Sequence, residues 1–169
     1  HWSCTKSEEE LIMADKASSN LTVSIFMDDI KSSLGGSSDY TPVSADDDAW
    51  VFAEVAVAYN GTDILDTSDS YLGSANAVAT SDKVKWVAIK NTSTTSTEGV
   101  GISVSGADAA YNTTDTIILG NGEVLVLKTP NLTVAGLHGK ACVLDSNGKP
   151  SSQGTGTTTC QVAAILENV

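Results

Sequence analysis

The segment from Lys83 to Lys128 most constrains the fold of this 169-residue chain. It contains four short runs rich in β-branched residues, at 84–89, 100–104, 117–119 and 124–127. Polar stretches of Asn, Ser, Thr and Gly separate the runs, and the last two flank the turn Gly120-Asn121-Gly122. Runs of this kind between turn-forming residues are typical of strands joined in hairpins. The segment therefore predicts two successive hairpins in a β-rich domain.

Further strands are expected at residues 21–26, 50–59, 140–144 and 160–166. The first of them (LTVSIF) alternates apolar and polar side chains, which is typical of a half-buried strand. One short helix is expected at 28–34, ended by Gly35-Gly36. About eight strands with long polar loops predict an all-β fold, either an antiparallel β-sandwich or a jelly roll.

Five large apolar side chains in these strands are the expected core anchors: Trp50, Phe52, Trp86, Ile102 and Leu125. The lysines that flank the Trp86 strand are hard to bury. We expect them on an exposed face or at a sheet edge.

Residues 1–19 are expected to be a leader or flexible N-terminal arm, and residues 20–169 a single β-sandwich domain. The run Glu8-Glu9-Glu10 precedes Met13 at the spacing of a purine-rich ribosome-binding tract translated in frame. On this interpretation Met13 is the natural start. The alternative is a short acidic helix, because Ser7 and Glu10 form a capping box.

Cys142 and Cys160 lie in two expected strands on either side of one polar loop. They are a candidate disulfide if those strands form a hairpin and the Cα atoms approach within roughly 7 Å. Two buried thiols are the favoured interpretation, because we find no apolar segment of a signal peptide. Cys4 has no evident partner.

The formal net charge is −12, from nine basic and 21 acidic residues. A chain of this charge repels phosphate backbones, so no nucleic-acid partner is expected. No apolar run approaches the ~20 residues that span a bilayer, so no membrane segment is expected.

No catalytic, cofactor-binding or metal-binding residues are predicted. His138 is the one imidazole in the expected domain, and no Gly-x-Ser-x-Gly motif accompanies it. We expect it to be a partly exposed turn residue. One histidine and separated cysteines provide no zinc-binding spacing. The run 46–48 (DDD) lacks the spaced pattern of a calcium loop and is expected to be solvated.

Five Asn-x-Ser/Thr sequons occur, at Asn20, Asn60, Asn91, Asn112 and Asn131. In a secreted protein they would be glycosylation acceptors. In a chain this rich in Ser and Thr we attribute them to composition.

Three stretches, WVAIKNTS, TIILGNGEVLVLKTPN and CQVAAILENV, carry a resemblance to small head proteins of tailed bacteriophages. In that family an Ile-x-Leu-x-x-Gly-Glu turn, here Ile117 to Glu123, starts a strand pair of a β-sandwich. The resemblance covers about half of the chain, from Trp86 to its end. It implies a non-enzymatic decoration, or cement, protein on the outer surface of a virion. Such proteins bind the major capsid protein, usually as trimers at local threefold positions.

Two other functions remain open at this point. One is a different virion component, such as a head fibre, neck or tail protein. The other is a carbohydrate- or surface-binding β-sandwich module, which would need exposed aromatic side chains on one face.

Overall fold

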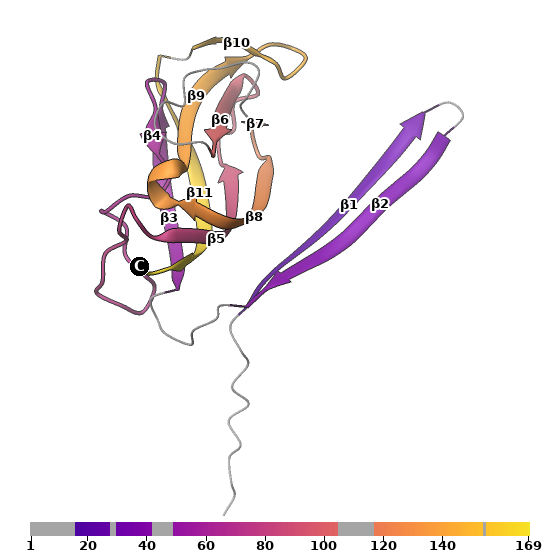
Figure 1. Ribbon diagram of the computed structural model, residues 1–169. Coiled ribbons are helices and arrows are strands. Elements are labelled where there is room, and N and C mark those ends of the chain that lie inside the picture. The colour runs from indigo at the N-terminus through magenta and orange to yellow at the C-terminus, as the bar shows by residue number, and fades with distance from the viewer. Residues whose placement is uncertain (1–15, 28–29, 42–48, 105–116, 154) are drawn as a thin grey trace, which may run out of the picture. The chain divides into compact units, whose positions relative to one another are not determined.

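The computed structural model describes residues 16–27, 30–41, 49–104, 117–153 and 155–169. The chain forms two compact units, 1–45 and 46–169. Figure 1 shows the first as a two-stranded hairpin and the second as a β-sandwich. The prediction of an all-β antiparallel fold is confirmed.

The division of the chain differs from the expected one. The boundary expected between residues 19 and 20 falls inside a strand, and the first compact unit extends to Ala45. Most of the expected arm, including Met13 and the 8–10 acidic run, lies outside the described residues.

The first unit pairs β1 (Ala17–Met27) with β2 (Ile30–Tyr40). The antiparallel ladder is unbroken from the Ala17–Tyr40 pair to the Met27–Ile30 pair. The strand expected at 21–26 is part of β1, but the helix expected at 28–34 is wrong. A helix of seven residues leaves most of its backbone N–H and C=O groups unpaired within the helix, whereas the β ladder pairs them. Gly35 and Gly36 therefore pair with β1.

One sheet of the second unit has four antiparallel strands in the order β3–β11–β5–β8. Their bounds are β3 (Trp50–Ala58), β5 (Lys83–Asn91), β8 (Val124–Thr133) and β11 (Thr157–Glu167). The last strand of the chain, β11, lies between β3 and β5.

The other sheet has the order β10–β9–β6–β7, and β4 also pairs with β9. Its strands are β4 (Thr62–Asp63), β6 (Glu98–Ser103), β7 (Ile117–Leu119), β9 (His138–Leu144) and β10 (Pro150–Gln153). A single 3-10 turn, η1 (Val134–Gly136), connects β8 to β9. The described residues thus contain eleven strands, because β2, β4 and β10 formed where helix or loop was expected.

Neither hairpin expected within residues 83–128 is formed. β5 and β6 belong to different sheets, as do β7 and β8. Gly120-Asn121-Gly122 is a turn, with Gly122 at a φ of 74°, but it links the two sheets and does not close a hairpin. Sequence spacing detected the strands, whereas pairing depends on which faces can be buried together.

Alternate residues of both sheets fill one core. The four-stranded sheet contributes residues such as Val57, Ile89 and Val162, and Ile102 lies in the same cluster from the other sheet. Leu125 is partly buried against it. Two of the five expected anchors therefore pack in or on the core.

The three aromatic anchors belong elsewhere. Phe52 is 54% exposed, Trp50 is half-buried, and Trp86 is buried but outside the core cluster. Opposite β11, the register of β5 shifts by one residue between Trp86 and Val84, which makes Lys85 an extra residue. Such a bulge reverses the alternation that follows it, so Val84 faces the core and Trp86 faces outward. The core expectation for Phe52 is wrong, because on β3 the neighbouring Val51 and Ala53 take the inward positions.

Asn91, at the end of β5, links the two sheets. Its fully buried Nδ2 donates to the carbonyls of Glu98 and Leu119, both at 3.2 Å, and its Oδ1 accepts from the backbone N–H of Ser93. Buried amides of this kind are stable only when their hydrogen bonds are made. The Asn91 sequon is therefore inaccessible in the folded protein.

Asp82 organises the long segment between β4 and β5. Its buried carboxylate accepts hydrogen bonds from the Tyr71 hydroxyl at 2.5 Å, the Ala79 N–H at 2.7 Å and the Val169 N–H at 3.2 Å. This one side chain therefore connects the loop and the C-terminal residue.

Candidate binding surfaces

His138 is the first residue of β9 and is not a turn residue. Its side chain is 14% exposed, and its Nδ1 lies 2.7 Å from Oδ1 of Asp63. Its Nε2 lies 2.6 Å from the carbonyl oxygen of Ala135. Both ring nitrogens therefore face oxygen acceptors, and neither is directed at a nucleophile.

The sheet register places Ser103, His138 and Asp63 side by side on three neighbouring strands. Sequence reasoning missed this combination, because the three residues are far apart in the chain. A hydrolase triad requires the serine hydroxyl to bond the histidine nitrogen that the acid does not hold. Here that nitrogen bonds the Ala135 carbonyl instead, so the geometry supports a structural role for His138.

Cys142 and Cys160 are both free thiols. Their strands, β9 and β11, lie in different sheets and do not form the hairpin on which a disulfide depended. Cys160 belongs to the core cluster, and burial raises the pKa of its thiol to about 11. Burial also raises the pKa of the Cys142 thiol. Neither is a reactive nucleophile, since the thiolate is the reactive form.

Two aspartates of the loop after β4 have shifted pKa values for local reasons. Hydrogen bonds from Ser68 lower the pKa of the Asp66 carboxyl, and burial raises the pKa of the Asp69 carboxyl. Asp69 accepts from the backbone N–H of Asp66 at 2.9 Å. These contacts are those of a tight turn.

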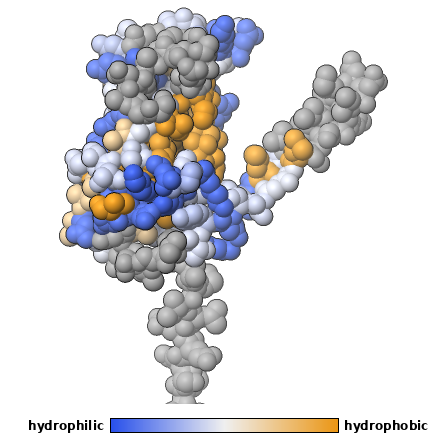
Figure 2. Space-filling model, viewed as in Figure 1, coloured by the Kyte–Doolittle hydropathy of each residue, from blue (hydrophilic) through white to orange (hydrophobic). Residues whose placement is uncertain are grey.

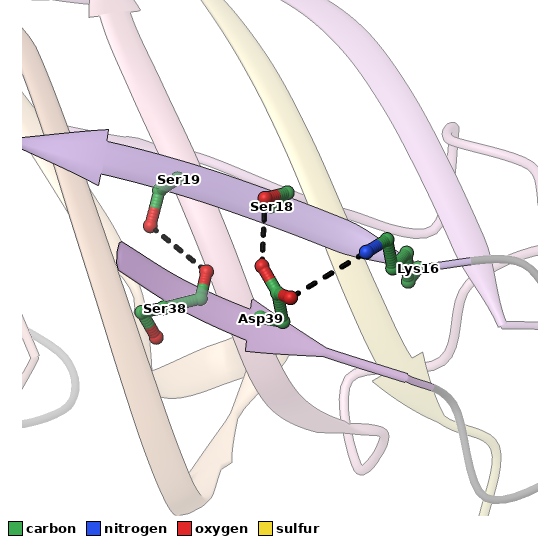
Figure 3. Close-up of polar contacts among 5 residues, drawn as sticks. All are labelled: Lys16, Ser18, Ser19, Ser38 and Asp39. Carbon is green, nitrogen blue, oxygen red and sulfur yellow. Dashed lines mark hydrogen bonds and ion pairs between the residues drawn. The ribbon is translucent and has the colours of Figure 1, made fainter. Parts of the chain in front are cut away.

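The open end of the β1–β2 hairpin carries a small polar network, shown in Figure 3. Asp39 accepts a hydrogen bond from Ser18 at 2.6 Å and faces the ammonium group of Lys16 at 3.5 Å. Ser19 donates to the carbonyl of Ser38 at 3.3 Å. All these contacts cross from one strand to the other, so they hold the register of the hairpin.

Apolar side chains on the same hairpin are exposed to solvent. Leu21 is 67% exposed and Leu34 is 63% exposed. The register pairs Leu21 with Gly36 and Leu34 with Val23, which puts both leucines on one face. A hairpin with exposed leucines on one face is suited to binding an apolar surface.

The outward face of the four-stranded sheet, which we call the outer face, is the second apolar surface. The register aligns Trp50, Ile165 and Trp86 in one row across β3, β11 and β5. The next row includes the exposed Phe52 and, on β8, Val126. Figure 2 shows apolar residues gathered at the surface over β8.

The Nε1 of Trp86 is buried and has no hydrogen-bond partner among the described residues. Orphaned buried N–H groups are rare in native proteins. This group lies in one of the central rows of the outer face.

A hollow of about 500 Å³ lies beside the end of β8. Its lining residues are Val104, Thr129, Pro130, Asn131, Leu132, Thr133 and Gly136. No titratable side chain is among them, so the hollow has no groups for acid–base chemistry.

In the part of the chain that the structure describes, no three His, Cys, Asp or Glu side chains are grouped as metal ligands would be. Within the same ranges, no helix has the length and apolar character needed to cross a bilayer. The 46–48 acidic run and Asn112 lie outside the described residues. Asn20, Asn60 and Asn131 are exposed.

Searches with this chain found no matching protein-family model, no matching curated protein and no matching solved structure.

Proposed function

We propose that this chain is a structural protein that decorates the outer surface of a viral capsid and stabilises it, without enzymatic activity. The observation that carries the proposal is the β1–β2 hairpin, a compact unit of its own with two exposed leucines on one face. An isolated two-stranded hairpin is at best marginally stable in water. Docking on a larger assembly would cover its apolar face and stabilise it.

The sandwich fits the scaffold role in this proposal. Its buried polar groups, Asn91 and Asp82, are engaged in hydrogen bonds to backbone and side-chain partners. A rigid body with a separate arm gains affinity through multivalency, because the second contact forms at high effective concentration once the first is made. The resemblance to phage head proteins indicates that the partner is the major capsid protein.

The proposal is tested with the full chain and with heads that lack it. We expect the double substitution Leu21→Ser, Leu34→Ser to weaken head binding at least tenfold. Burial of one leucine side chain contributes about 1.5–3 kcal/mol of binding free energy. The matched control is Ser37→Ala, at an exposed hairpin position that pairs with Asn20. Co-sedimentation with heads measures occupancy, and thermal unfolding checks that the sandwich is intact.

Equal occupancy for wild type and double variant would overturn the proposal. Binding to glycans that Phe52→Ala abolishes would instead support the carbohydrate-binding alternative. The exposed ring of Phe52 favours this alternative.

A further inference from the structure

The outer face has an apolar centre that its own sheet leaves partly uncovered. Phe52, Val124 and Val126 are all exposed, and they lie on the two edge strands, β3 and β8. Between them the register aligns Phe52, Ala163, Ala88 and Val126 in one row. Because the two alanines have short side chains, they project little from the middle of this row, and a second sheet can approach closely.

Charged residues on this face are segregated by strand. The lysines lie on β5 and β8: Lys83, Lys85, Lys90 and Lys128. The two glutamates, Glu54 and Glu167, lie on β3 and β11. This sheet therefore holds four of the nine basic residues of a chain whose net charge is −12.

We propose that two copies of this chain pack outer face to outer face about a twofold axis parallel to the strands. Such an axis places β3 of one copy over β8 of the other, and β11 over β5. The register then brings Phe52 over Val126. Both side chains are exposed within one copy, so this contact covers apolar surface on both copies. Ile165 and Trp86, one row away, are already buried within one copy. Face-to-face sheets pack about 10 Å apart.

The same axis makes the charges complementary. Glu54 shares its row with Lys90, so it lies near Lys90 of the other copy once β3 sits over β8. Glu167 shares its row with Lys83 and forms an ion pair with Lys85 of its own chain, so Glu54 and Lys90 carry the charge argument. A twofold axis perpendicular to the strands would instead place β5 over β5, with lysines facing lysines. Because a twofold interface requires a self-complementary surface, the charge pattern favours a second copy over an unrelated partner.

This contact is independent of the proposed capsid binding, which rests on the hairpin. It also differs from the threefold assembly that the phage resemblance implies. Sedimentation velocity and light scattering of the full chain measure it directly. We expect a particle with twice the 17.4 kDa mass of the chain, in concentration-dependent equilibrium with monomer.

Charge reversal tests the geometry. Glu54→Lys and Lys90→Glu should each weaken self-association about tenfold, because each reverses two symmetry-related contacts. Mixing the two variants should restore a heterodimer, in which every reversed charge meets its complement. Lys149→Glu, the same charge change at an exposed position outside this face, is the matched control and should leave the dimer intact.

Phe52→Glu should yield a monomer with unchanged circular dichroism, because the ring is largely exposed within one copy. A wild-type monomer at all concentrations would overturn the inference. So would a trimer, or a dimer that Phe52→Glu does not affect. Failure of the mixed variants to associate would exclude this axis.

Discussion

Cys160 shows how burial alters the chemistry of one side chain. It lies in the core, and burial raises the pKa of its thiol to about 11 from an ordinary value of 9.0. The sequence favoured a buried thiol, but the apolar surroundings that raise its pKa come from strands distant in the chain.

This shift predicts a pH dependence of stability. The thiol loses its proton near pH 9 in the unfolded chain but only near pH 11 in the folded protein. The contribution to the free energy of unfolding is therefore complete below pH 9 and is lost as the pH rises to 11, by about 2–3 kcal/mol. Urea denaturation at pH 8, 9 and 10 measures the loss.

Cys160→Ala is the control, because it removes the titrating group while other groups continue to titrate. We expect the stability of this variant to decline less steeply above pH 9 than that of wild type. Parallel pH profiles would show that the Cys160 thiol is not buried as described.

For single residues, the expected burial depended on which face of a strand pointed toward the core. The strand expected at 50–59 was found as β3, but the assignment of Phe52 to the core was wrong. Large apolar side chains favour burial, yet the outward face of a sheet can also carry aromatic side chains when another surface packs on it.

At the scale of elements, β9 depends on a close approach of its backbone to the core. A Cβ atom on Gly139 would lie 2.5 Å from Cδ1 of Ile64 and 3.1 Å from Cγ1 of Val57. Both neighbours are fully buried and have little room to move. Gly139 is thus required for the packing of β9 against β3 and the loop after β4.

We expect Gly139→Ala to lower the free energy of unfolding by about 1–3 kcal/mol through overpacking. Chemical denaturation measures the change. Gly156→Ala is the matched control, because nothing lies within 4 Å of its Cβ position. Equal stability of the two variants would contradict the described packing.

Strand pairing was the least predictable property of the elements. The strand runs between residues 84 and 127 are all present, but none pairs with its expected partner: β5 pairs with β8 and β6 with β7. β11 pairs with β3 across a sequence separation that no local pattern encodes. A bulge at Lys85, one residue long in the pairing with β11, decided which face of β5 holds Trp86.

At the scale of the whole molecule, the described apolar side chains of the two units differ in exposure. The sandwich has a core formed by both sheets, whereas the hairpin exposes Leu21 and Leu34. Local stability is low where few apolar contacts are buried. The two units should therefore differ in dynamics even in the native state.

Hydrogen exchange tests this difference. We expect backbone amides of β1 and β2 to exchange at least tenfold faster than those of β5 and β11, which are central strands of their sheet. Binding to heads should slow exchange in the hairpin if it docks as proposed. Equal protection of hairpin and central strands in the unbound protein would argue against a marginal arm.

The sequence by itself determined the all-β class, most strand positions, the acidic charge and the lack of a recognisable catalytic motif. These follow from local composition and period-2 alternation, which act over a few residues. Only the tertiary structure decided the pairing order, the separate hairpin and the outer face with its segregated lysines and glutamates. Each of these depends on residues distant in the chain, and burial of their common surfaces selects the arrangement.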